Sequence, residues 1–381
     1  MAKYLVEYKP PSWAQHLKNV PTHKVELAME NTPIHEWNLP GIPDGFSLHI
    51  KRHDMTGSSL SGNKVGKLEF LLADAILKGC KHVITCGTSP SNHCRALALA
   101  CRQLGLVPHL FLTMTSEDLG CRGNILLDRL SGADIYMMPP DSDDERDVHP
   151  KMESLARRIM SETGEKSCLV PKGGANLIGC FGSMAIFDEL YNQGALDRFD
   201  DVMVACGSSG TASGICIANY LAGSPLRVHG VLVRHDPEFA HDHVNSTLRQ
   251  LGVEGVRSED IFSIIDTYQG EGYSISKQEE LGIFPVRADV LTGFPLESLG
   301  DEGMESFLTL IWKMKNLKTS SSATAFRKFH CGGEQYNRGA GRPHLHGQGG
   351  LGGDAGDEEQ PRPLQGTEGP LRTHRGDVWA V

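Results

Sequence analysis

The sequence has no apolar run that approaches the roughly 20 residues a membrane helix needs. It also lacks a signal-peptide core, because Lys3, Glu7 and Lys9 interrupt the apolar residues near the N-terminus. Positive charge is short as well, with 37 lysines and arginines against 47 aspartates and glutamates. Since no basic stripe can neutralise phosphates, we expect neither a nucleic-acid nor a membrane partner and predict a cytoplasmic protein that acts on small molecules.

Two nucleotide-binding motifs and one thiol motif are missing too. No lysine stands in the G-K-[ST] position of a Walker loop, and the G-x-G-x-x-G pattern is absent. The ten cysteines form no C-x-x-C pair. Six of them lie singly inside apolar runs, namely Cys80, Cys86, Cys101, Cys168, Cys206 and Cys216. We interpret these six as buried reduced thiols rather than metal ligands or a redox couple, and we predict no metal site.

Between residues 46 and 250 the sequence alternates short apolar runs with amphipathic stretches. This alternation is typical of repeated β-α units and predicts an α/β fold with parallel sheets. The expected strands are 47–52, 82–86, 109–113, 134–138, 167–170, 202–206 and 227–233. Helices are expected at 64–78, 92–104 and 211–221.

The pattern changes beyond residue 281, where the alternation of strands and helices fades. Only residues 305–315 keep a helical pattern. From Cys331 onward about a quarter of the residues are glycine, with scattered proline and charge, and such a composition cannot bury enough apolar surface to fold. We therefore predict a low-complexity, disordered tail over residues 317–381.

Three polar loops follow expected strands and precede expected helices, where open parallel sheets bind their ligands. The loop at 206–211 is rich in small residues, which let backbone N–H groups converge on an anion. The sequence therefore predicts a phosphate cradle formed by Gly207, Ser208, Ser209, Gly210 and Thr211. The alternative is an ordinary tight turn between a strand and a helix.

The second loop places Lys64, after Asn63, at the first position of a helix. A lysine there opposes the helix dipole, which favours the neutral amine that imine chemistry needs. The alternative is a solvated surface lysine. The third loop brings Ser91, Asn92 and His93 to another helix start, where an N-cap by Ser91 or Asn92 is the alternative to a catalytic role.

Taken in order, these loops resemble the tryptophan-synthase-β type of pyridoxal-phosphate fold. Within it, the chain resembles the D-cysteine desulfhydrase and 1-aminocyclopropane-1-carboxylate deaminase family over about residues 32–280. The motifs that carry the resemblance are 32–35 (TPIH), 51–57 (KRHDMTG), 62–70 (GNKVGKLEF), 91–93 (SNH), 173–176 (GGAN), 207–211 (GSSGT) and 270–273 (GEGY).

The resemblance implies a role for several of these residues. Lys64 would be the Schiff-base lysine, Asn63 and Asn92 would bind the cofactor, and Asn92 would contact its ring hydroxyl. Ser91 would face the substrate and Tyr273 would be an active-site phenol. The loop at 207–211 would hold the cofactor's phosphate. It also implies a discontinuous larger cofactor-binding domain of residues 1–66 and 181–316, a smaller α/β domain of residues 67–180, and a homodimer.

The activity implied is a lyase reaction that eliminates the β-substituent of a small amino acid, converting D-cysteine to pyruvate, hydrogen sulfide and ammonia. His93 favours this branch, since a glutamine is more usual in the deaminase branch, which is the alternative. The chain departs from the family at His53, Ser61 and Gly66. It also lacks a recognisable Asp-Pro-Val-Tyr segment after Tyr273. A catalytically impaired protein of the same fold is therefore a further alternative.

Overall fold

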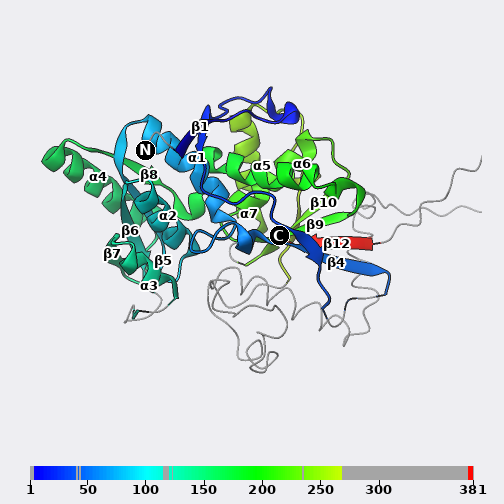
Figure 1. The fold of residues 1–381 in the computed structure, drawn as a ribbon, viewed down its shortest axis with the longest axis horizontal. Helices are drawn as coiled ribbons and strands as arrows, with labels where there is room; N and C mark the ends of the chain where they lie inside the picture. Colours follow the sequence, from blue (N-terminus) through cyan, green and yellow to red (C-terminus); the bar gives the residue numbers. More distant parts are fainter. Residues whose placement is uncertain are drawn as a thin grey trace, which may run out of the picture. The chain divides into compact units, whose positions relative to one another are not determined.

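The computed structural model describes residues 4–39, 42, 44–114, 120–121, 123–233 and 236–267, together with the backbone of residues 376–380. Tyr273 and the helix expected at 305–315 lie outside these residues. Two larger sheets organise the described part, and each is covered by helices (Figure 1). A small antiparallel pair of strands, β1 (Leu5–Glu7) and β2 (His23–Val25), lies apart from both.

The larger sheet has six strands in the order β11-β10-β9-β12-β4-β3. In that order their bounds are Ser263–Ile265, Arg227–Leu232, Asp201–Cys206, Gly376–Ala380, Phe46–Lys51 and Ile34–Glu36. All neighbouring pairs are parallel except β3 and β4. Apolar side chains of β9 and β10 pack in one core with the helices α5 (Leu177–Asn192), α6 (Gly210–Leu221) and α7 (Pro237–Leu251). The short α8 (Ser258–Ile261) precedes β11.

The smaller sheet is fully parallel, in the order β7-β6-β5-β8. In that order its strands are Asp134–Met138, Val107–Thr113, Cys80–Thr88 and Lys166–Val170. Leu110 and Leu112 of β6 join the core with α1 (Lys64–Leu77), α2 (Asn92–Gln103) and α3 (Gly123–Leu130), whereas Phe111 faces α4 (His149–Thr163). Successive side chains of a strand point to opposite faces, so this sheet has helices on both sides.

The α/β class with parallel and mixed sheets is confirmed, and all seven expected strands are present within a few residues of their expected bounds. The three expected helices correspond to α1, α2 and α6. Short helical turns complete the described part: η2 (Ser12–Ala14), η3 (His53–Met55), η4 (Asp144–Val148), η5 (Lys172–Gly174) and η6 (Ala195–Asp197).

Strand β12 differs from the sequence-based expectation. It lies inside the span expected to be a disordered tail, yet residues 376–380 pair in parallel with β4 on one side and β9 on the other. The composition of the tail misled the prediction, because a five-residue segment with two open strand edges to pair with needs little apolar content around it. The rest of the tail lies outside the described residues.

Of the six cysteines expected to be buried, five are, and Cys168 is half-buried. The nine cysteines in the described part carry free thiols. No helix in this part is long and apolar enough to cross a membrane. The same residues hold no group of three or more His, Cys, Asp or Glu side chains placed to bind a metal ion.

Candidate active site

The turn that leads from β4 to α1 is fixed by one backbone carbonyl. The carbonyl oxygen of His53 accepts hydrogen bonds from Thr56 Oγ1 and from the backbone N–H of Gly62, both at 2.9 Å. Gly62 has a φ of +91°, a conformation that residues with a side chain rarely adopt. Lys64 then begins α1 with 9% of its surface exposed, so the alternative of a solvated surface lysine is wrong.

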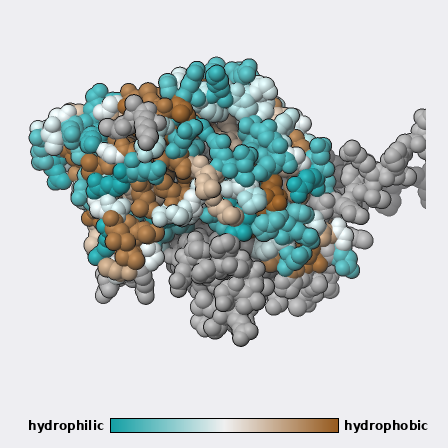
Figure 2. All heavy atoms as spheres, in the orientation of Figure 1, coloured by the Kyte–Doolittle hydropathy of each residue, from teal (hydrophilic) through white to brown (hydrophobic). Residues whose placement is uncertain are grey.

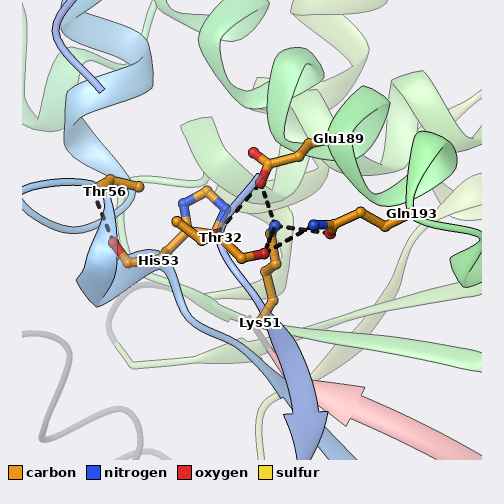
Figure 3. A network of polar contacts seen from close by, with 6 residues as sticks. All are labelled: Thr32, Lys51, His53, Thr56, Glu189 and Gln193. Atoms are coloured by element: carbon orange, nitrogen blue, oxygen red, sulfur yellow. Dashed lines mark hydrogen bonds and ion pairs between the residues drawn. The ribbon is translucent and has the colours of Figure 1, made fainter. Parts of the chain in front are cut away.

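A buried polar network holds the end of β4, just before this turn (Figure 3). Lys51 Nζ donates to the Thr32 carbonyl at 2.6 Å and to Gln193 Oε1 at 2.9 Å, and it forms an ion pair with Glu189. Gln193 Nε2 also donates to the Thr32 carbonyl, at 3.0 Å. Loss of a partner would leave a buried, uncompensated charge, so these contacts hold Lys51 firmly to α5 and its C-terminal cap. The network therefore fixes the end of β4, from which the turn toward Lys64 begins.

The loop between β9 and α6 has the geometry of an anion-binding turn. Ser209 has a φ of +60° and is buried, although it carries a side chain. Non-glycine residues in this region are uncommon and cluster at ligand-binding sites. Directly after Ser209, α6 begins at Gly210, so its first backbone N–H groups are available to an anion.

A hydrogen bond joins this loop, residues 207–211, which we name the phosphate loop, to the turn between β4 and α1, residues 52–64, which we name the lysine turn. Asn63 Nδ2 donates to Thr211 Oγ1 at 2.9 Å, across 148 positions of the sequence. Lys64 and the loop expected to hold a phosphate therefore belong to one site.

Lys67 is a buried cation at this site that the sequence analysis did not single out. It is 1% exposed and donates to the Gly173 carbonyl at 3.3 Å. A Cβ added to Gly210 would lie 3.0 Å from Lys67 Nζ, which places the ammonium beside the start of α6. Burial, and then the positive charge of Lys67, lower the pKa of His243 to about 4. The signal was available, because Lys67 follows Lys64 by three residues and so shares its helix face.

The third loop, which carries Ser91, Asn92 and His93, is held in place by an N-cap and by hydrogen bonds of a side-chain amide. Ser91 Oγ accepts from the backbone N–H of Cys94 at 3.2 Å, which confirms the N-cap. Asn92 Oδ1 accepts from Asn124 Nδ2 at 3.0 Å and from Arg95 at 3.3 Å. Both side chains are buried, so their orientation is set by protein groups.

His93, next in the sequence, is oriented by β5. Thr85 Oγ1 donates its single proton to the Val170 carbonyl at 2.8 Å, so His93 Nε2 donates to Thr85 Oγ1 at 3.0 Å. The ring is thereby fixed in one tautomer while it is neutral. His93 is 2% exposed.

The glycine turn at η5 lies against the phosphate loop, the first turns of α1 and the start of α2. A Cβ added to Gly173 would lie 2.6 Å from Ser208 Oγ, in the phosphate loop. A Cβ added to Gly174 would lie 3.5 Å from His93 Cε1 and 3.7 Å from Lys67 Cβ. Both glycines have positive φ values, a conformation that residues with a side chain rarely adopt, so a substitution at either position would strain the turn.

Helix α5 packs very closely against both α1 and α6. A Cβ added to Gly182 would lie 2.2 Å from the Gly66 carbonyl oxygen of α1. A Cβ added to Gly214 of α6 would lie 2.3 Å from Ser183 Cβ of α5. The two helices that start at the lysine turn and at the phosphate loop are therefore packed against one common support.

The structure thus brings together the expected residues on the lysine turn, on the phosphate loop and at the start of α2, whereas Tyr273 lies outside the described residues. The arrangement fits a phosphorylated cofactor: the start of α6 offers N–H groups, and the buried ammonium of Lys67 beside Gly210 supplies positive charge. Lys64 offers an amine for covalent attachment.

Comparison with known proteins agrees with this arrangement. The model of the family described as pyridoxal-phosphate dependent enzyme matches residues 25–281. A bifunctional D-cysteine desulfhydrase/1-aminocyclopropane-1-carboxylate deaminase of Arabidopsis thaliana, described as mitochondrial, is 41% identical over 292 residues, which cover 74% of this chain and 72% of the relative. A putative 1-aminocyclopropane-1-carboxylate deaminase of Thermotoga maritima is 34% identical over 273 residues, 70% of this chain and 85% of the relative.

A solved structure extends the agreement to the fold. The crystal structure of an ACC deaminase homologue is 29% identical, has a TM-score of 0.67, and covers 82% of this chain and 93% of its own. The resemblance drawn from the motifs is confirmed: the chain belongs to the pyridoxal-phosphate-dependent enzymes, in the family of the D-cysteine desulfhydrases and 1-aminocyclopropane-1-carboxylate deaminases.

Proposed function

We propose that this chain is a pyridoxal-phosphate-dependent lyase that converts D-cysteine and water to pyruvate, hydrogen sulfide and ammonia. The observation that carries the proposal is the hydrogen bond from Asn63 to Thr211, which joins the turn of Lys64 to the phosphate loop. A lysine that carries this cofactor has to lie within reach of the group that anchors the phosphate.

Each residue of the site has a task in this proposal. Pyridoxal phosphate supplies an aldehyde that binds amines and a ring that accepts electrons. Lys64 supplies the amine for attachment and, once free, the base that takes the proton from the substrate's α-carbon. The start of α6 and Lys67 neutralise the phosphate. Asn92 orients the ring, and Ser91 faces the substrate while it caps α2.

The choice of D-cysteine rests on His93 and on the names of relatives. The Arabidopsis relative is named for both D-cysteine desulfhydrase and cyclopropane-carboxylate deaminase activity. The second candidate is therefore deamination of 1-aminocyclopropane-1-carboxylate, in which Ser91 would take part in ring opening. Tyr273, proposed as an active-site phenol, belongs to the same scheme.

Lys64→Ala tests the covalent step. The wild-type protein should show the visible absorption of lysine-bound cofactor, and borohydride should fix the cofactor on the tryptic peptide that contains Lys64. The variant should lose both features and sulfide release, whereas Lys81→Ala, at an exposed contact with the Gly105 carbonyl, should keep them. Full sulfide release by Lys64→Ala rejects the mechanism.

Substrate assays separate the alternatives. Sulfide and pyruvate from D-cysteine support the proposal, and ammonia with 2-oxobutanoate from the cyclopropane substrate supports the deaminase. A protein that binds cofactor on Lys64 but converts neither substrate is the impaired member of the family considered above.

The remaining expectations extend this proposal to assembly and location. We propose the two-domain division given above, because the smaller sheet lies within residues 67–180 and the described strands of the larger sheet lie outside them. We propose a homodimer, for which exposed apolar side chains such as Leu130 and Met137 offer contact area. Hydrophobic surface gathers in the region of α3 and β7 (Figure 2). Sedimentation of the purified protein tests the dimer, and imaging of the tagged full chain tests cytoplasmic location.

A further inference from the structure

Arg95 of α2 contacts two parts of the site at once. Its guanidinium donates to the carbonyl of Ser59, to the carbonyl of Ser61 at 3.4 Å, and to Asn92 Oδ1 at 3.3 Å. Ser59 and Ser61 lie directly before Asn63 and Lys64, on the lysine turn. Arg95 itself is 6% exposed. One planar group with several fixed donors therefore links the lysine turn to the start of α2.

These contacts fix the orientation of the Asn92 side-chain amide, that is, which side carries its oxygen and which its NH₂ group. A guanidinium has no acceptor, so it can approach only the oxygen of the amide. Asn124 Nδ2 approaches the same oxygen at 3.0 Å, and its orientation is itself fixed by a bond to the Pro90 carbonyl at 2.6 Å. With its oxygen held by two donors, Asn92 presents its NH₂ group on the other side, as a donor.

We propose that Arg95 is a positioning residue that fixes the Asn92 amide with its NH₂ group toward the cofactor ring and holds it in register with the turn of Lys64. The inference rests on the proposed function, since it needs the cofactor on Lys64 and Asn92 beside the ring oxygen. A donor beside that oxygen stabilises its negative charge and so lowers the pH at which the lysine-bound cofactor loses its proton.

Arg95→Lys tests the proposal, because lysine keeps the charge but cannot bridge three acceptors with a planar fork. We expect an about tenfold weaker cofactor affinity, equivalent to about 1.4 kcal/mol, and an upward shift of the pH midpoint of the cofactor's absorption. Arg102→Lys is the matched control, because Arg102 lies on the same helix and donates to the carbonyls of Ser131 and Gly132, on the chain after α3. It should leave both quantities unchanged.

Asn92→Asp separates positioning from packing. This variant loses the NH₂ donor but keeps the acceptors, so it should also raise the pH midpoint. The double variant should shift the midpoint no further than Asn92→Asp alone, since Arg95 acts on the midpoint through that amide. Additive shifts, or an Arg95→Lys midpoint equal to wild type, overturn the proposal.

Arg95→Gln decides the question if Arg95→Lys does not fold. A glutamine amide at position 95 can still donate a hydrogen bond, but it is neutral and cannot hold the Asn92 oxygen and the lysine turn at the same time. An upward shift of the midpoint supports the proposal, and an unchanged midpoint overturns it. A wild-type protein that carries no cofactor on Lys64 would instead reject the proposed function, so the two failures are distinct.

Discussion

Asn63 donates a hydrogen bond to Thr211 at 2.9 Å, and this bond joins the two loops on which the site depends. A hydrogen bond of this kind contributes about 0.5–1.5 kcal/mol, so its removal should weaken cofactor binding by roughly twofold to twelvefold. Thr211→Val removes the acceptor, whereas Thr211→Ser keeps it and is the control. Equilibrium binding of pyridoxal phosphate measures the difference.

The same pair offers a double-mutant cycle. Asn63→Ala and Thr211→Val should each weaken binding, and together they should cost less than the sum of the two, because each already removes the shared bond. Strict additivity would show that the two residues act separately.

In the proposed function Lys67 balances the charge of the cofactor's phosphate. Lys67→Met should weaken binding of pyridoxal phosphate by about tenfold or more, because a charge-assisted hydrogen bond contributes about 1.5–3 kcal/mol. Binding of pyridoxal, which has no phosphate, should change little. Lys166→Met, at an exposed lysine, serves as control. An equal loss for both ligands would show that Lys67 supports the fold rather than the phosphate.

The contact between Gly182 and Gly66 should be intolerant of a side chain. Gly182→Ala would place a Cβ 2.2 Å from a backbone oxygen, so α1 and α5 would have to separate. We expect a loss of about 1–3 kcal/mol in the free energy of unfolding, measured by urea denaturation. Ser183→Ala, at the next residue, removes a buried hydroxyl that has no hydrogen-bond partner among the described residues, and it should cost little or stabilise.

Asp128 should make stability depend on pH. Its side chain is fully buried on α3, and neither carboxylate oxygen has a hydrogen-bond partner in the described part of the chain. Burial raises the pKa of Asp128 to about 7, against the opposing charge of Arg95. In the unfolded chain an aspartate titrates near about 3.9, so between these pH values the folded protein binds one more proton.

The contribution of Asp128 to stability is therefore greatest at low pH and is lost as the pH rises through about 7. Asp128→Asn removes this dependence. Its free energy of unfolding should rise relative to wild type from about pH 4 to about pH 7 and then stay level. A difference between the two proteins that is the same at every pH contradicts the assignment.

The sequence predicted those strands that are long enough to show an apolar pattern between turn residues. Strands β1, β2, β3 and β11 have three residues each, too few for any period to appear. Their pairing is decided by neighbours that are distant in sequence. Strand β12 was missed because its pairing with β4 and β9 also depends on distant neighbours, and because the composition of the surrounding stretch indicated disorder.

The candidate site was predictable where a short motif carries the chemistry. Lys64, Ser91 and the loop at 207–211 stand at helix starts, which the sequence marks with glycine, serine and asparagine. Lys67 and Arg95 were overlooked because a charged residue within an amphipathic helix is normally taken as solvent-facing. For Lys67 the three-residue spacing from Lys64 was a usable signal, because it places both on one helix face. The burial of Arg95 follows from the approach of the lysine turn, which no local pattern encodes.

Strand β12 is made long after the strands on either side of it, since 170 positions separate the end of β9 from its start. At about 5–20 residues per second, synthesis of that stretch takes on the order of 10 s. During this interval β4 and β9 each present an unpaired edge to the cell. Until β12 is made and fills the gap, these two edges can pair with other chains, so the nascent chain is exposed to aggregation during this interval.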